Sequence, residues 1–216
     1  MSEEEKRSAA DYVPKQRTLP IMSKAVQSCR GCDLFKFATQ AVFGEGKAKA
    51  RIMMVGEQPG DQEDLQGRPF VGPAGRILDK ALDEAGIDRS TVYVTNAVKH
   101  FKFEERGKRR LHKKPRVGEV NACRPWLDAE IETVKPRIVV ALGATALLSL
   151  GGRALHVLRD RGQFFPHPIA GALMVTIHPS ALLRIPDHDQ REIEYKRFVD
   201  ELKQVKLRLE SGSRPA

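Results

Sequence analysis

The sequence reads Arg51-Ile-Met-Met-Val-Gly56, and Glu57-Gln-Pro-Gly60 follows directly. A short apolar run that ends in glycine and proline is typical of a buried parallel strand leading into a loop. Three further apolar runs have the same character, at 91–96, 137–143 and 173–177. The sequence therefore predicts four strands buried on both faces.

Segments with helical spacing of apolar residues separate these strands. They lie at 74–85, 117–134 and 187–209, and 21–37 is expected to form a short helix that runs into a turn. Alternating strands and helices predict a single α/β domain with a short central parallel four-stranded sheet and helices on both faces. We expect this domain to span 21–209, after a loose leader at 1–20 and before a flexible tail at 210–216.

The composition is that of one globular domain. The chain has 216 residues, of which 41% are hydrophobic, enough for a single core. No apolar run approaches the roughly 18 residues that span a membrane, and the N-terminal residues lack the apolar core of a signal peptide. We therefore expect a cytoplasmic, nucleoid-associated protein, with a monomer as the default state.

The positive charge of the chain is concentrated in one segment. Lys and Arg number 37 against 28 Asp and Glu, and seven of these cations, with no acid, lie in Arg106-Gly-Lys-Arg-Arg-Leu-His-Lys-Lys-Pro-Arg116. Such a focused basic segment is expected to contact a phosphate backbone, with a solvated surface loop as the alternative. His112 is the one imidazole within it.

Polar side chains follow three of the predicted strands. Glu57, Gln58 and Asp61 come after the first strand, Asn96 ends the second, and His178 follows the fourth. The carboxyl ends of parallel strands meet at one edge of a sheet, where ligands bind. These side chains can together hold a small polar heterocycle and act on a bond beside it.

Four candidate metal ligands are spread over the chain, at Cys29, Cys32, His100 and Cys123. Three cysteines cannot all form disulfides, and a reducing compartment disfavours even one. Three thiolates and one imidazole can bind zinc or an iron–sulfur centre, and their spacing does not choose between the two. The alternative is that Cys123 is an ordinary buried residue and that the other two thiols are incidental.

Four motifs closely resemble those of the iron–sulfur uracil-DNA glycosylases, often called family 4. They are Gly56-Glu-Gln-Pro-Gly60, Glu63-Asp-Leu-Gln-Gly-Arg-Pro-Phe-Val-Gly-Pro-Ala-Gly75, Thr95-Asn-Ala-Val-Lys99 and His178-Pro-Ser180, within a resemblance that covers about residues 25–205. Two features depart from that family: His100 stands where it usually has a cysteine, and the basic segment is an insertion. Both match its UdgX branch, which is marked by a Lys-Arg-Arg-apolar-His motif, here Lys108 to His112.

The resemblance implies a role for each residue at the strand ends. Phe70 would stack on uracil, Asn96 would read its polar edge, and Gln58 would add a contact. His178 would donate a hydrogen bond to the departing uracil anion, and Glu57 would orient or deprotonate a water. A role in shaping the pocket is expected for Asp61, with a helix cap or a loop salt bridge as the alternative.

The resemblance also implies that His112 attacks C1′ of the sugar in place of water and leaves a lasting protein–DNA bond. Neighbouring cations should lower the pKa of His112 and keep it neutral, and Glu57 could accept the proton released. The expected phosphate contacts are Lys108, Arg109, Arg110, Ser180 and Arg184. By resemblance, the four metal ligands would hold a 4Fe–4S cluster that braces the DNA-binding face.

The sequence thus predicts a uracil-DNA glycosylase, favouring single-stranded DNA, that traps the abasic sugar covalently through His112. Two alternatives remain at this point. One is a conventional multiple-turnover glycosylase in which His112 only contacts phosphate, and the other is a noncatalytic iron–sulfur protein that binds single-stranded DNA.

Overall fold

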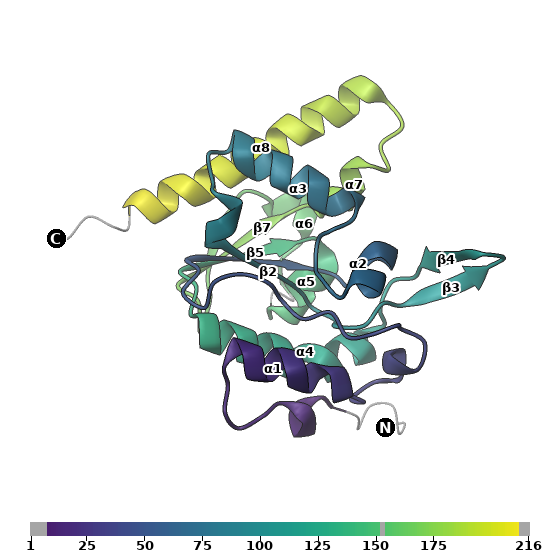
Figure 1. Cartoon of the computed structure of the whole chain (residues 1–216). Coiled ribbons are helices and arrows are strands. Elements are labelled where there is room, and N and C mark those ends of the chain that lie inside the picture. Colours follow the sequence, from purple (N-terminus) through teal and green to yellow (C-terminus); the bar gives the residue numbers. More distant parts are fainter. Residues whose placement is uncertain (1–7, 152–153, 212–216) are drawn as a thin grey trace.

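A central five-stranded sheet organises the computed structural model, which describes residues 8–151 and 154–211 (Figure 1). Its strands are β1 (Ile52–Gly56), β2 (Val92–Asn96), β5 (Ile138–Leu142), β6 (Phe164–Pro166) and β7 (Ala172–Thr176). Their order is β2-β1-β5-β7-β6. The four predicted strands are confirmed, and they pair in parallel. The prediction missed β6, a three-residue antiparallel edge strand that is too short to show a period.

Helices cover both faces of the sheet, as predicted. The α-helices are α1 (Leu19–Ala25), α2 (Asp61–Gln66), α3 (Pro73–Glu84), α4 (Val117–Val134), α5 (Ala144–Ser149), α6 (Val157–Asp160), α7 (Pro179–Leu182) and α8 (His188–Ser211). The predicted helix at 117–134 is confirmed in full, and those at 74–85 and 187–209 are confirmed within two residues. The segment at 21–37 contains the end of α1 and two short 3-10 turns.

Each strand contributes alternate side chains to two separate cores, because successive side chains point to opposite faces of a sheet. Met54 of β1 lies in the core beneath α3 and α8, together with Leu78 and Phe198. Its neighbour Met53 lies in the core beneath α4 and α5, together with Leu127. Burial on both faces explains why the strands read as continuous apolar runs. No helix in the described part of the chain is long and apolar enough to cross a membrane.

Within its described part, the predicted N-terminal leader contacts the domain at one buried residue. Residues 1–7 lie outside the described part, but Ala9 is buried and its N–H donates to the carbonyl of Ala122 in α4. Ala9 therefore attaches this part of the chain to α4, while most side chains of residues 8–20 are exposed or half-buried. At the other end α8 continues to Ser211, and 212–216 lie outside the described residues.

The basic segment was predicted as a loop, but most of it is a β-hairpin. Strands β3 (Phe103–Arg106) and β4 (Arg109–His112) pair antiparallel and project from the body of the domain (Figure 1). Gly107, with a φ of 60°, forms part of the tight turn between them, a conformation that favours glycine. Charged residues at nearly every position hid the strand from a search for apolar alternation.

A buried ion pair supports the end of β2. The Nζ of Lys99 lies 2.5 Å from Oε2 of Glu130, and both side chains are fully buried. Lys99 also donates to Oγ1 of Thr95 and to the carbonyl of Asn96, each at 2.7 Å. Glu130 in turn accepts from the hydroxyl of Tyr93 at 2.9 Å. Each charge in this network is paired with an opposite charge. Removing one partner therefore leaves the other as an unpaired charge in the core.

We predict that Lys99→Met lowers the free energy of unfolding by about 3–5 kcal/mol, because Glu130 then remains as an unpaired buried charge. The double variant Lys99→Met/Glu130→Gln should recover part of this loss, since the amide is neutral and can still accept hydrogen bonds. Urea denaturation monitored by circular dichroism measures both.

The matched control is Lys203→Met, which removes an exposed ion pair with Asp200 and should change stability little. Equal effects of Lys99→Met and Lys203→Met would contradict a structural role for the buried pair.

Candidate active site

The carboxyl ends of the parallel strands open into a cleft of about 750 Å³. Nine of the twelve residues predicted to act in catalysis, substrate binding or DNA binding line it: Glu57, Gln58, Asp61, Phe70, Asn96, His112, His178, Ser180 and Arg184. Lys108, Arg109 and Arg110 of the hairpin do not line it. The register of the sheet explains the convergence, because Gly56 at the end of β1 pairs with Asn96 at the end of β2.

The floor of the cleft depends on two glycines. A Cβ on Gly56 would lie 2.4 Å from Oδ1 of Asn96 and 2.8 Å from Cζ of Phe70, so any side chain there would fill the space between them. A Cβ on Gly75 would lie 1.7 Å from the carbonyl oxygen of Phe70. Phe70 itself has a φ of 57°, a left-handed conformation that is rare outside glycine. The backbone is thus held in a strained form that turns this ring into the cleft.

His178 is held as a neutral ring with a defined orientation. Its Nδ1 accepts a hydrogen bond from the backbone N–H of Ser180 at 3.1 Å, which leaves the proton of the neutral ring on Nε2. The pKa of His178 is lowered to about 4, mainly by burial and to a smaller extent by the neighbouring Arg184 and His112. The ring of Phe70 is stacked near it, with centroids 6.1 Å apart. His178 can therefore donate from Nε2 without carrying a charge.

Glu57 lies between two partners. Its Oε2 accepts a hydrogen bond from Oγ1 of Thr145, and its Oε1 lies 3.4 Å from Nε2 of His112. The second contact is longer than an ordinary hydrogen bond. Thr145 was missed by the sequence prediction, although it follows the third predicted strand and so belongs to the same rim.

The pKa of His112 is lowered mainly by partial burial of the ring, while Glu57 raises it and Arg184 lowers it. This direction agrees with the predicted lowering of the pKa by nearby cations, of which Arg184 is one, but the largest cause is burial, which the sequence did not reveal. The Nε2 of His112 is the ring nitrogen that faces Glu57.

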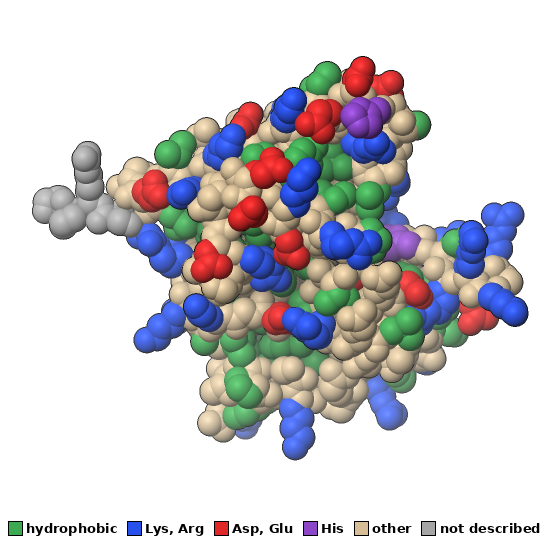
Figure 2. Space-filling view, turned by 45° about the horizontal axis from the view of Figure 1, so that its top comes forward, with side chains coloured by type: hydrophobic (Ala, Val, Ile, Leu, Met, Phe, Trp, Pro, Cys, Tyr) green, Lys and Arg blue, Asp and Glu red, His purple; other side chains and the backbone are tan. Residues whose placement is uncertain are grey.

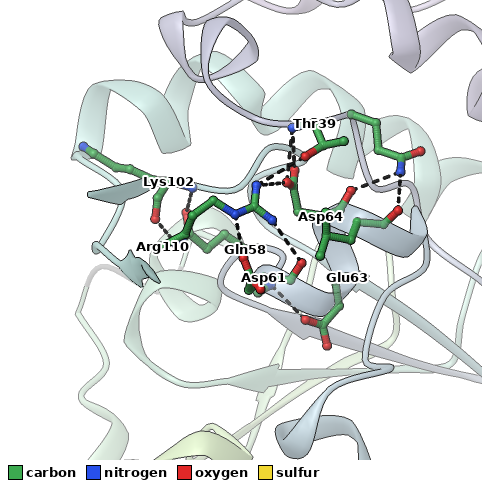
Figure 3. A network of polar contacts seen from close by, with 10 residues as sticks. Thr39, Gln58, Asp61, Glu63, Asp64, Lys102 and Arg110 are labelled. Atoms are coloured by element: carbon green, nitrogen blue, oxygen red, sulfur yellow. Dashed lines mark hydrogen bonds and ion pairs between the residues drawn. The ribbon is translucent and has the colours of Figure 1, made fainter. Parts of the chain in front are cut away.

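The two arginines of β4 point in opposite directions. Residues 110 and 112 lie on one face of β4, and 109 and 111 on the other, since side chains alternate along a strand. Arg110 faces the domain, where its guanidinium lies 2.6 Å from carboxylate oxygens of both Asp61 and Asp64 (Figure 3). For Asp61, a loop salt bridge was the predicted alternative to shaping the pocket, and this salt bridge is present. These ion pairs fix the face that also carries His112.

Aromatic stacking adds to this attachment. The guanidinium of Arg110 lies over the rings of Phe101 and Phe103, at 5.5 and 5.0 Å from their centroids. The two rings are themselves stacked at 5.1 Å, and His112 lies 6.1 Å from Phe101. The guanidinium of Arg110 thus contacts two aromatic rings as well as two carboxylates.

The side chain of Gln58 joins the two ends of the hairpin. Its Nε2 donates to the carbonyls of Lys102 and Lys113, and its Oε1 accepts from the N–H of Lys102, all at 3.0–3.1 Å. These three hydrogen bonds use both amide protons and the carbonyl oxygen. The side chain of Gln58 thus supports the root of the hairpin beside Glu57, and its predicted contact with uracil, through backbone or side chain, stays a prediction.

The outer side of the hairpin carries the exposed cations. Figure 2 shows Lys and Arg side chains gathered on the projecting strands, with a histidine near their root. Arg109 is exposed and pairs in register with Arg106, and Lys108 lies in the turn. These positions suit contact with an acidic polymer that passes the mouth of the cleft.

The three cysteines lie together in a third apolar cluster, between α1 and α4, with Trp126. The indole N–H of Trp126 donates to Sγ of Cys29 at 3.2 Å, and the N–H of Lys99 donates to Sγ of Cys123 at 3.3 Å. Burial raises the pKa of Cys32 to about 11 and that of Cys123 to about 12. Thiolates here would need a bound cation to stabilise them.

The remaining predicted ligand, His100, is buried directly after Lys99 in the chain. Among residues 8–151 and 154–211, no group of three His, Cys, Asp or Glu side chains is placed to hold a single metal ion. Three buried thiols and one buried imidazole are residue types that bind zinc or iron–sulfur centres, and their joint binding of a cluster stays a prediction.

Comparisons with known proteins agree with this geometry. The sequence-family model of the uracil DNA glycosylase superfamily matches residues 43–203. A type-4 uracil-DNA glycosylase of Pyrobaculum aerophilum is 41% identical over 175 residues, covering 78% of this chain and 86% of the relative. A type-4 enzyme of Thermotoga maritima is 38% identical over 180 residues, covering 83% and 90% respectively.

A third type-4 uracil-DNA glycosylase, from Saccharolobus solfataricus, is 36% identical over 176 residues and covers 78% of each chain. These matches confirm the resemblance to the uracil-DNA glycosylases, whereas membership of the UdgX branch stays a prediction. Together with the rim of polar side chains at the strand ends, they establish that the chain belongs to the uracil-DNA glycosylase superfamily.

Proposed function

We propose that this protein excises uracil from DNA, with a preference for single strands, and that His112 then captures the abasic sugar covalently. The observation that carries the proposal is the position of His112, whose Nε2 lies in the cleft 3.4 Å from the Glu57 carboxylate. A nucleophile and a carboxylate there face the place where the sugar of a bound nucleotide would lie.

Recognition of uracil uses the inner end of the cleft. A target base must leave the stack before an enzyme can act on it. The ring of Phe70 provides a surface on which the pyrimidine stacks, and the amide of Asn96 hydrogen-bonds to its polar edge. The small size of Gly56 leaves room for the base between these two side chains.

Cleavage breaks the bond between C1′ and N1 of uracil. The sugar becomes cationic as the bond lengthens, and the electron pair moves onto the uracil. The Nε2–H of His178 donates a hydrogen bond to the developing anion, and a neutral donor requires no proton transfer. The Glu57 carboxylate faces the sugar and stabilises its positive charge.

Capture follows when the lone pair on Nε2 of His112 attacks C1′. The new C–N bond makes the ring cationic, and loss of the Nδ1 proton to solvent restores a neutral imidazole. Because the attacking atom is Nε2, Glu57 acts here by its charge and not as the acceptor of the Nδ1 proton. Lys108, Arg109 and Arg184 contact the phosphates on either side.

We further propose that Cys29, Cys32, His100 and Cys123 hold a 4Fe–4S cluster. This cluster would join the N-terminal segment to α4 and to the segment after β2, and so brace the side of the domain from which the hairpin projects. The N–H donors at two of the three sulfurs support this assignment.

We predict that wild-type protein and a uracil-containing single-stranded oligonucleotide give a heat-stable shifted band on a denaturing gel, and that His112→Ala abolishes this band. Removal of the imidazole removes the nucleophile, so the variant should release uracil without forming an adduct. Lys108→Ala is a suitable comparison, because it removes a hairpin cation and leaves His112 in place.

The gel separates the alternatives. Free abasic product without a shifted band from the wild type indicates conventional turnover, and intact substrate indicates binding alone. A shifted band that persists in His112→Ala overturns the choice of nucleophile.

The pH dependence of adduct formation follows from the neutral state of His112. Protonation of Nε2 removes its lone pair, so the rate falls as the pH drops through the pKa of His112, which lies below the ordinary value of 6.5. At pH 6.5 we therefore expect more than half of the rate measured at pH 8, whereas an unshifted imidazole would leave about half. Single-turnover assays at constant ionic strength measure this profile, and a midpoint at or above pH 6.5 would contradict it.

The cluster assignment predicts that the protein purifies with iron and a brown visible absorbance, and that His100→Ala reduces both together. Iron analysis and absorption spectroscopy provide the readout, and His167→Ala, an imidazole far from the cysteines in sequence, is the control. Full iron content and an unchanged spectrum in His100→Ala would exclude His100 as a ligand.

A further inference from the structure

We propose that Thr145 is a positioning residue that fixes the orientation of the Glu57 carboxylate. Thr145 lies in the first turn of α5, directly after β5. Strand β5 pairs with both β1 and β7, whose ends carry Glu57 and His178. The end of β5 contributes no residue to the proposed chemistry. The side chain of Thr145, just beyond it, is buried and lines the cleft.

The hydrogen bond from Thr145 makes the two oxygens of the Glu57 carboxylate different. The hydroxyl donates to Oε2, so Oε1 is the oxygen that faces Nε2 of His112. A carboxylate held at one oxygen cannot turn freely about its terminal bond. Thr145 therefore determines which oxygen of Glu57 is presented to the cleft.

The same short segment also contacts the other proposed catalytic group. Gly143 has a φ of 90°, and a Cβ built on it would lie 3.2 Å from Cβ of His178. The backbone there packs closely against His178, while Thr145, two residues later, holds Glu57. The segment 143–145 thereby sets the spacing between Glu57, which stabilises the sugar, and His178, which donates a hydrogen bond to the departing uracil.

This inference rests on the proposed function, because Glu57 matters only if the sugar reacts. The hydroxyl itself does not touch the reacting atoms and acts through Glu57. Loss of the hydrogen bond should then slow the chemical step without weakening the binding of DNA, since Glu57 gains its importance as charge develops on the sugar.

The test measures single-turnover uracil release from a single-stranded uracil oligonucleotide over a range of protein concentrations. Thr145→Val keeps the shape of the side chain and removes the hydroxyl. We expect its maximal rate to fall roughly ten- to hundredfold, the range for loss of a hydrogen bond to a charged group, with an unchanged half-saturating concentration. Thr145→Ser should restore most of the rate.

A control on the same helix is Ser149→Ala. Ser149 is also buried, but its hydroxyl donates to the carbonyl of Ala146 within α5, and Ser149 does not line the cleft. This variant should match the wild type. If Thr145→Val does not fold by circular dichroism, Thr145→Ala provides the same comparison.

A double-mutant cycle with Glu57→Gln distinguishes positioning from a general structural effect. If Thr145 acts through the carboxylate, Thr145→Val should cost little further in the Glu57→Gln background. Additive losses, or a wild-type rate in Thr145→Val, overturn the inference while uracil release by the wild type still supports the proposed function. Failure of the wild type to release uracil overturns the proposed function, and the inference with it.

Discussion

The parallel pairing of β1 with β2 and β5 is the constraint on which the site depends. Parallel strands that start in register also end in register, and here Gly56 stands opposite Asn96 at the same edge. Residues that follow the strands are therefore brought together although more than 100 positions separate Glu57 from His178. The buried Lys99–Glu130 pair also supports this edge, because Lys99 donates a hydrogen bond to the carbonyl of Asn96.

The hairpin is attached to this edge by its inward face. Arg110 binds two carboxylates of α2, and Gln58, the residue that follows Glu57, binds both ends of the hairpin. A slip of one residue in the pairing of β3 with β4 would turn His112 outward and bring Arg109 inward. The position of His112 thus depends on strand register as much as on sequence motif.

Much of this arrangement could be predicted from the sequence, because apolar runs and helical spacing report directly on burial. The four parallel strands, the helix at 117–134 and the convergence of Glu57, Asn96 and His178 all followed from such patterns. The hairpin could not be recognised in this way, since its side chains are mostly charged and its strands are stabilised by ion pairs and stacking. The roles of Arg110 and Gln58 depend on partners more than 40 positions away, which no local pattern reveals. Thr145 could have been found by applying the strand-end rule to β5 as well.

The engagement of Arg110 changes how the charge of the basic segment should be counted. Two carboxylates neutralise this arginine, and Lys113 pairs with Glu104 across the hairpin. A cation that already has a protein partner releases no counterion from DNA when the two meet. The salt dependence of DNA binding should therefore be shallower than seven cations would give at about 0.7 per neutralised phosphate for single strands. The hairpin is thus better suited to hold the His112 imidazole in a fixed position than to bind DNA through a large number of free cations.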